Sequence, residues 1–263
     1  MARLIPLFSG SSGNSYFLGE NDNGILIDIG RNCKQTTEML KSLNIAPEAV
    51  KAIFVTHEHS DHVKGLRVFS SKYKTPVYAT GGTFGALRSM GELNDKFPQY
   101  EIGEGAVAAG MSVFPFHTSH DCAESCGYRV EMPDGKIFSL ATDLGFVSDE
   151  VKDGIKGSDY IVIESNHDVR MLNNGPYPYQ LKRRILSDRG HLSNDSCAHF
   201  LPELIKNGTR SFMLAHLSHE NNLPELAYET SACELKMEGM HENIDFTLTC
   251  ARRENTDGRT IIF

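Results

Sequence analysis

Short apolar runs alternate with segments of helical spacing along most of the chain. Strands are expected at residues 3–8, 15–18, 24–30, 52–55, 76–79, 111–116, 127–131, 136–140, 159–163, 210–215, 245–250 and 259–263. Helices are expected at residues 36–43, 63–70, 82–90, 178–186, 194–205 and 224–237. This alternation predicts an α/β fold with sheet layers inside and helices outside. No repeat or flexible linker divides the sequence, so we expect a single domain spanning residues 1–263.

Residues able to bind a metal follow several of the apolar strands directly. His57, Asp143, Glu164 and His216 each come just after such a run, and residues 117–121 follow another. Catalytic groups gather at the carboxyl ends of strands in layered α/β folds because the sheet is rigid and the loops are open. The pattern therefore predicts one site assembled from distant parts of the chain.

The densest group of candidate ligands is His57, His59, Asp61 and His62. His57 and His59 are two residues apart and project to the same side if the strand geometry continues. Asp61 and His62 lie on the following turn and reach a second position, which indicates two adjacent metals. A polar loop with incidental histidines is the alternative, but three of the 11 histidines fall within six positions here.

The number of candidate ligands also fits two metals. One metal would take His57, His59 and either His117 or His120, the other would take Asp61, His62 and His216, and Asp143 would bridge both. Imidazole and carboxylate ligands suit Zn²⁺, Mn²⁺ or Fe²⁺ and do not choose among them. Two metals about 3.5–4 Å apart would share a water and lower its pKa, which supplies a nucleophile for hydrolysis.

Composition and charge narrow the classes of function and the compartment. A chain of 263 residues with 40% hydrophobic residues can bury its own core. Its net charge of −8 argues against coating nucleic acid over the whole surface but allows a local basic patch. The six cysteines are scattered apart from Cys122 and Cys126, so free thiols in a reducing cytoplasm are expected. We expect no secretory signal and no membrane contact; the oligomeric state is left open.

The HxHxDH motif at residues 57–62 and the later ligands, in this order, resemble the metallo-β-lactamase fold. The resemblance implies a four-layer αββα sandwich, with two mixed sheets flanked by helices. The motifs at residues 9–14, 164–168 and 190–194 resemble the YycJ/WalJ branch, which is related to the RNase Z-like phosphodiesterases. In that branch a His-Asp-Ala motif carries the third ligand. His120-Asp121-Cys122 matches it with Cys in place of Ala, which favours His120 over His117.

The branch implies a nuclease, specifically a 5′-to-3′ DNA exonuclease linked to DNA repair. Related phosphodiesterases use a Glu after a strand to orient a His that protonates the leaving oxygen, and this role carries over to Glu164 and His191. A neighbouring carboxylate favours the protonated imidazole and fixes its tautomer, as a general acid requires. Asp61 is expected to act in catalysis as well as in metal binding. The alternative for His191 is a cap on the following helix.

Candidate substrate contacts come from three segments. They are Ser11, Ser12 and Asn14 in the opening loop, Asn166 in the second motif, and Lys182, Arg183 and Arg184 in a basic stretch. Small residues in the loop would let a phosphate approach closely, although a tight hairpin turn explains them equally. The basic stretch suits a polyanion, and Tyr177 and Tyr179 beside it offer stacking for bases. A solvated helix face or a plain loop is the alternative there.

Two other functions fit the same ligands. One is hydrolysis of a small ester, thioester or lactam, because a fold does not fix the substrate. Such an enzyme does not need the Glu164–His191 pair. The other is a regulatory protein with an inert metal site, against which the full set of ligands argues.

Overall fold

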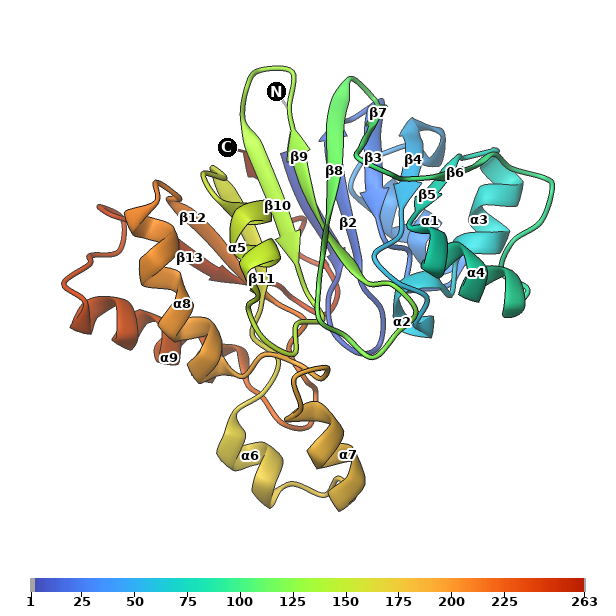
Figure 1. Ribbon diagram of the computed structural model, residues 1–263. Coiled ribbons are helices and arrows are strands. Elements are labelled where there is room, and N and C mark those ends of the chain that lie inside the picture. The colour runs from blue at the N-terminus through green and yellow to red at the C-terminus, as the bar shows by residue number, and fades with distance from the viewer. Residues whose placement is uncertain (1–2, 263) are drawn as a thin grey trace.

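The computed structural model describes residues 3–262, in which two mixed sheets face each other and helices cover both outer sides (Figure 1). The strands of the first sheet, in spatial order, are β14 (Ile261–Ile262), β1 (Arg3–Phe8), β2 (Ser15–Glu20), β3 (Asn23–Ile27), β4 (Val50–Phe54), β5 (Val77–Ala79) and β6 (Gln99–Glu101). Those of the second sheet are β13 (Thr247–Cys250), β12 (Ser211–Ala215), β11 (Tyr160–Glu164), β10 (Ile137–Ala141), β9 (Cys126–Glu131), β8 (Met111–His117) and β7 (Ala106–Ala108). The expected four-layer αββα sandwich is confirmed.

The helices divide between the two outer layers and one projecting segment. Beside the first sheet lie α1 (Cys33–Ser42), the 3₁₀ turn η1 (Pro47–Ala49), α2 (Ser60–Val63), α3 (Leu66–Tyr73) and α4 (Gly81–Ser89). Beside the second sheet lie α5 (Asp149–Ile155), α8 (Asn194–Lys206) and α9 (Pro224–Met237). The projecting segment carries α6 (Val169–Asn174) and α7 (Tyr179–Ile185) (Figure 1).

Successive side chains of the central strands pack alternately into two hydrophobic cores. In β3, Ile25 and Ile27 pack into the core between the two sheets, whereas Leu26 packs into the core under the outer helices. Successive side chains of a strand point to opposite faces, so one continuous apolar run serves both cores. Strands buried on both faces in this way read as apolar runs in the sequence.

The structure departs from the expected elements at several points. Strand β3 ends at Ile27 instead of residue 30 because Asp28 has a φ of +61°, which leaves the extended region. The helix expected at residues 63–70 is two helices, α2 and α3, which meet at Lys64 and Gly65. Short elements were not expected, namely η1, α5, α6, β6 and β7. The last expected strand shrinks to residues 261–262, and Phe263 lies outside the described residues.

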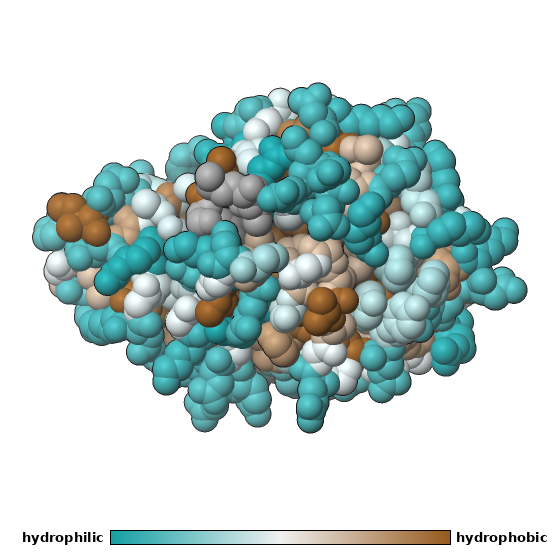
Figure 2. Space-filling view, turned by 90° about the horizontal axis from the view of Figure 1, so that it is seen from above, coloured by the Kyte–Doolittle hydropathy of each residue, from teal (hydrophilic) through white to brown (hydrophobic). Residues whose placement is uncertain are grey.

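The carboxyl ends of the parallel strands meet at one end of the sandwich. Strands β3 and β4 are parallel in one sheet, and β10, β11 and β12 are parallel in the other. Their following loops lie at the lower end in Figure 1, where α6 and α7 project. Figure 2 shows the opposite end, where hydrophilic residues predominate and hydrophobic ones form small groups. Among the described residues no helix is long and apolar enough to cross a membrane.

Candidate metal centre

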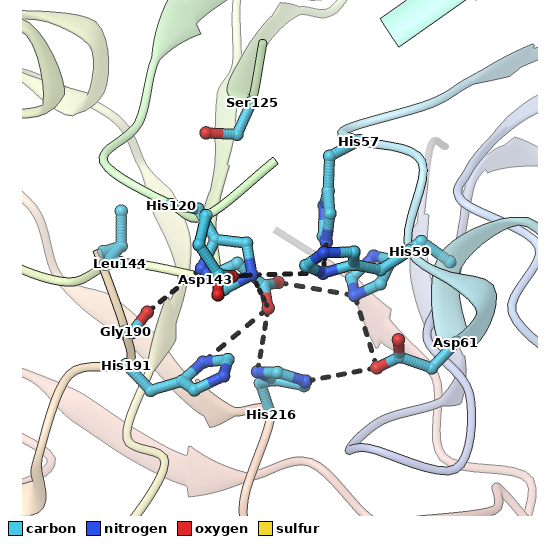
Figure 3. Close-up of polar contacts among 12 residues, drawn as sticks. His57, His59, Asp61, His120, Ser125, Asp143, Leu144, Gly190, His191 and His216 are labelled. Atoms are coloured by element: carbon cyan, nitrogen blue, oxygen red, sulfur yellow. Dashed lines mark hydrogen bonds and ion pairs between the residues drawn. The ribbon is translucent and has the colours of Figure 1, made fainter. Parts of the chain in front are cut away.

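The strand-end loops bring the expected ligands together in one cluster (Figure 3). Within each of four overlapping groups the potential ligand atoms lie within 4.8 Å of one another. The groups are His57, His59 and His120; His57, His62 and Asp143; Asp61, His62 and His216; and Asp143, Glu164, His191 and His216. The carboxyl end of β11 and the segments that follow β4, β10 and β12 supply most of these side chains, as the strand-end pattern predicts.

Three imidazole nitrogens converge in the first group. His57 Nε2 lies 3.0 Å from His59 Nδ1, and His120 Nε2 lies 3.3 Å from the same atom. The other nitrogen of His120, Nδ1, faces the carbonyl oxygen of Gly190 at 3.0 Å. A hydrogen donated there leaves the lone pair of Nε2 directed into the group, as in metal sites whose histidines are oriented by a carbonyl. His117 is exposed and takes no part in these groups.

Asp143 lies between the first group and the second. Its Oδ1 is 3.7 Å from His120 Nε2, and its Oδ2 is 3.4 Å from His62 Nε2. Asp61 Oδ2 lies 3.6 Å from His62 Nε2 and 3.7 Å from His216 Nε2 (Figure 3). Asp143 therefore has one oxygen toward each half of the cluster, which is the position of a bridging carboxylate.

Two buried polar atoms of the cluster support the presence of a cation. Asp143 Oδ2 and His216 Nε2 have no hydrogen-bond partner among the described residues, and both residues are buried. Buried polar groups are almost always hydrogen-bonded, because a lost partner costs about 1–3 kcal/mol. The chemistry of the donors, imidazole and carboxylate, fits a divalent transition metal.

Asp28 is a functional residue that the sequence analysis did not single out. This buried carboxylate accepts hydrogen bonds from Thr56 N–H at 2.8 Å and from Thr56 Oγ1 at 2.8 Å. His62 Nδ1 lies 2.7 Å from Asp28 Oδ2. Because an ionised carboxylate only accepts, Nδ1 carries the hydrogen, so the lone pair of the neutral ring is on Nε2, the atom that faces the cluster. The available signal was an acidic residue inside the apolar run of residues 24–30.

Glu164 joins the cluster to the pocket beside it. Its Oε1 lies 2.7 Å from His216 Nδ1 and 2.9 Å from His191 Nδ1. Its Oε2 accepts from the backbone N–H of Leu144 at 2.8 Å and from that of Leu192 at 2.9 Å. Four donors thus surround one buried carboxylate, and both rings must carry a hydrogen on Nδ1. The Glu164–His191 contact expected from the family resemblance is present.

Burial and neighbouring charges shift the pKa values of several residues in the cluster. Burial opposes the charged form of His62, yet Asp143, Asp28 and Asp61 outweigh it and raise the pKa of His62 to about 9. Burial and the neighbouring His62 hold the pKa of His57 well below its usual value. Burial disfavours the charged form of Asp143, but His216 and His62 hold its pKa well below the usual range. The carboxylates therefore favour the protonated form of His62, and the neighbouring histidines in turn favour the ionised form of Asp143.

Comparison with known proteins decides the family. Residues 23–217 match the β-lactamase superfamily domain. The sequence is 38% identical to exodeoxyribonuclease WalJ of Streptococcus pneumoniae over 244 residues, which cover 91% of this chain and 90% of that protein. It is 42% identical to exodeoxyribonuclease YycJ of Bacillus anthracis over 223 residues, 84% of each chain.

The chain belongs to the β-lactamase superfamily, in the WalJ/YycJ family. The resemblance drawn from the motifs is thereby confirmed. Zn²⁺-bound PqqB from Methylobacterium extorquens shares the fold with a TM-score of 0.74 over 100% of both chains, at 15% identity. The superfamily fold together with the His and Asp cluster supports binding of divalent metal.

The pocket of this WalJ/YycJ family member opens onto the cluster. It is lined by Ser11, His59, Asp61, His120, Asp121, Asp143, Asn166, Tyr177, Leu181, Arg184, Ile185, Gly190, His191, His216 and Ser218. Three of the expected substrate contacts, Ser11, Asn166 and Arg184, are therefore in its wall. Asn166 also donates from Nδ2 to the carbonyl oxygen of His216 at 2.8 Å, so it holds that loop in place.

Four expected substrate contacts lie away from the pocket wall. Ser12 is exposed, and its Oγ accepts from Arg31. Asn14 is buried and turned toward the cluster, with Nδ2 3.1 Å from His62 Nε2 and 3.4 Å from Asp61 Oδ2. Lys182 Nζ donates to the carbonyl oxygen of Asn173, and Arg183 lies over the ring of Tyr179. Consecutive basic residues on a helix point in different directions, so the sequence alone does not show which of them faces the pocket.

The cysteines agree with the expectation of free thiols. All six are free, including Cys122 and Cys126. Burial raises the pKa of Cys126 to about 12, so this thiol is not a thiolate ligand at neutral pH.

Proposed function

We propose that the protein is a dinuclear metal-dependent phosphodiesterase that removes nucleotides from the ends of DNA. The observation that carries the proposal is the shared carboxylate of Glu164, which contacts both the cluster residue His216 and the pocket residue His191. A lactam or thioester hydrolase has no need of an oriented imidazole at this point. The relatives named as exodeoxyribonucleases support DNA as the substrate.

In the proposed mechanism the residues of the cluster divide into two ligand sets. His57, His59 and His120 would hold one ion, Asp61, His62 and His216 would hold the other, and Asp143 has an oxygen available to each set. Zn²⁺ or Mn²⁺ is proposed, with Fe²⁺ compatible with the same donors. Bound there, the two ions would activate water and neutralise the charge of the phosphoryl transition state. Asp61 would also orient the attacking water.

His191 is the proposed general acid. Its ring is part of the pocket wall, and its Nδ1 hydrogen is held by Glu164 at 2.9 Å, so Nε2 is the atom left to protonate the leaving oxygen. A positioned acid of this kind contributes about 10²–10⁴-fold to the rate. Glu164 does not itself line the pocket and acts through His191 and His216, which do.

The substrate strand would pass from the pocket over the neighbouring surface. Ser11, Asn166 and Arg184 are proposed to contact the nucleotide in the pocket, and Ser12, Lys182 and Arg183 the strand beyond it. Asn14 is instead proposed to position Asp61 and His62. We further propose 5′-to-3′ polarity, a role in DNA repair and a single-domain protein. We also propose that the protein is cytoplasmic, which agrees with its six free thiols.

The test compares His191→Ala with His199→Ala, an exposed histidine on α8. We expect His191→Ala to lower the turnover of end-labelled DNA about 10²–10⁴-fold with unchanged metal content, and His199→Ala to act like the wild type. Cleavage at the wild-type rate by His191→Ala would exclude the general acid. Failure of the wild type to cut single- or double-stranded DNA with Zn²⁺ or Mn²⁺, alongside thioester or lactam turnover indifferent to His191, would establish the small-molecule alternative.

A further inference from the structure

One wall of the pocket comes from a segment outside the two-sheet sandwich. Helices α6 and α7 project below the sheets in Figure 1, and the pocket is lined by Leu181, Arg184 and Ile185 of α7. Their spacing of three and four residues places them on one face of that helix. Tyr177 lines the same pocket from the loop before α7 and is half-buried.

The two walls of the pocket differ in chemistry. On the side of the sheets it is lined by His59, Asp61 and His216 of the candidate metal centre. On the side of α7 it is lined by Tyr177, Leu181 and Ile185, and by Arg184, whose charge is paired with Asp121. A nucleotide also has two chemically different parts. Its anionic phosphate suits the wall formed by the metal centre, and its flat base suits the wall with the aromatic ring, because bases stack on aromatic rings.

The wall is fixed relative to the metal ligands. Arg184 pairs with Asp121 through Nε and through Nη2, the latter at 3.0 Å, and Asp121 follows His120 in the chain. Beyond α7, Arg189 donates to the carbonyl oxygen of His120 at 3.2 Å, and the carbonyl of Gly190 faces His120 Nδ1. These contacts tie α7, which begins two residues after Tyr177, to His120 and Asp121 before substrate arrives, as a selective site requires.

We propose that Tyr177, supported by Leu181 and Ile185, binds the base of the 5′-terminal nucleotide by stacking while its phosphate lies over the metal centre. The inference rests on the proposed nuclease function and adds the subsite that selects a nucleotide bearing a base. Tyr179 serves as the matched control, because it is two residues away, 73% exposed and absent from the pocket lining.

The experiment measures kcat/KM for two single-stranded DNAs that differ only at the 5′-terminal nucleotide, which is thymidine or an abasic tetrahydrofuran. Stacking on an aromatic side chain should give the wild type roughly a tenfold or greater preference for the thymidine end. We expect Tyr177→Ala to abolish this preference by slowing the thymidine substrate alone. Tyr177→Phe and Tyr179→Ala should retain it, and Leu181→Ala should reduce it.

The outcomes separate this inference from the proposed function. Equal slowing of both substrates by Tyr177→Ala, or no effect on either, would overturn the base subsite while leaving the nuclease function intact. No cleavage of either DNA by the metal-loaded wild type would instead overturn the nuclease function. Metal content measured for each variant shows whether the cluster is intact, and should a Tyr177 variant not fold, an unchanged preference in Leu181→Ala would overturn the subsite.

Discussion

Glu164→Gln replaces one oxygen by an NH₂ group at the point where four hydrogen bonds meet. In the wild type, Oε1 faces the Nδ1 atoms of His191 and His216, and Oε2 accepts from the N–H groups of Leu144 and Leu192. The two backbone donors cannot become acceptors. An NH₂ group facing them would leave two buried N–H groups without partners, at about 1–3 kcal/mol each.

The NH₂ group is therefore expected to face the two histidines, because their rings can move the hydrogen from Nδ1 to Nε2. In that tautomer Nδ1 of His216 accepts from the amide, and the hydrogen on Nε2 blocks the atom proposed as the metal ligand. Changes of this kind behind a metal-binding histidine weaken metal affinity about 10–100-fold. We expect a loss of that size at the site of His216, with the site of His57, His59 and His120 retained.

Metal affinity is measured by competition with a chelator of known affinity, followed by elemental analysis of the protein. Glu203→Gln is the control, since this exposed glutamate of α8 pairs only with Lys152 among its charged neighbours in the described chain. Both proteins should fold, because Gln has the shape of Glu. If Glu164→Gln held two metals as tightly as the control, the tautomer argument would be refuted.

Two further predictions concern pH and the packing under the metal ligands. His62 has a pKa raised to about 9, so its protonated form stabilises the metal-free protein fully below pH 6.5, and this contribution is lost as the pH rises through about 9. Metal binding displaces the same proton, so metal titrations should show affinity rising over this range, and a flat profile would contradict the charge assignment. Gly30→Ala would bring a Cβ to 1.7 Å from the carbonyl oxygen of Asp61 and should lower the free energy of unfolding in urea by about 3 kcal/mol. Gly85→Ala, with no atom within 4 Å on helix α4, should instead raise it by about 0.5–1 kcal/mol, and equal effects of the two would refute the close approach.

The ligands closest together in the chain were predictable because spacing alone groups them. His57, His59, Asp61 and His62 form one motif on either side of the start of α2, and the structure brings all four into the cluster. The later members needed a second argument, that parallel strands end at the same edge. That argument found Asp143, which lies between both halves of the cluster.

Asp28 and Asn14 show where this reasoning stops. The partners of Asp28 are Thr56 and His62, which lie 28 and 34 positions further along the chain. Asn14 lies in a loop of small polar residues that suggested substrate binding. Its side chain instead contacts Asp61 and His62, which are 47 and 48 positions away. Which way such a side chain turns depends on long-range packing, and a single sequence contains no spacing that reports it.

The short helices were missed because one or two turns give little periodicity. The only signals for α5 and α6 are their N-caps, Ser148 and Asp168, whose side chains accept from Val151 N–H and Met171 N–H. Together with α7, α6 forms the projecting segment (Figure 1). In this segment Tyr177 lines the pocket, whereas Tyr179 is exposed to solvent, a difference that the sequence does not reveal.

The backbone itself directs the cluster. Three of the seven non-glycine residues with positive φ in residues 3–262 are Asp28, Asp143 and His216, with φ of 61°, 59° and 55°. Each follows a strand, and the left-handed turn sends the side chain across the strand ends, at a cost of about 1–2 kcal/mol per residue. Hydrogen bonds offset the strain: Asp28 N–H donates to the carbonyl of Phe54 at 2.9 Å, and His216 N–H donates to Ser9 Oγ at 2.9 Å. The two sheets that bury the core therefore also fix the directions of the metal-facing side chains before any ion binds.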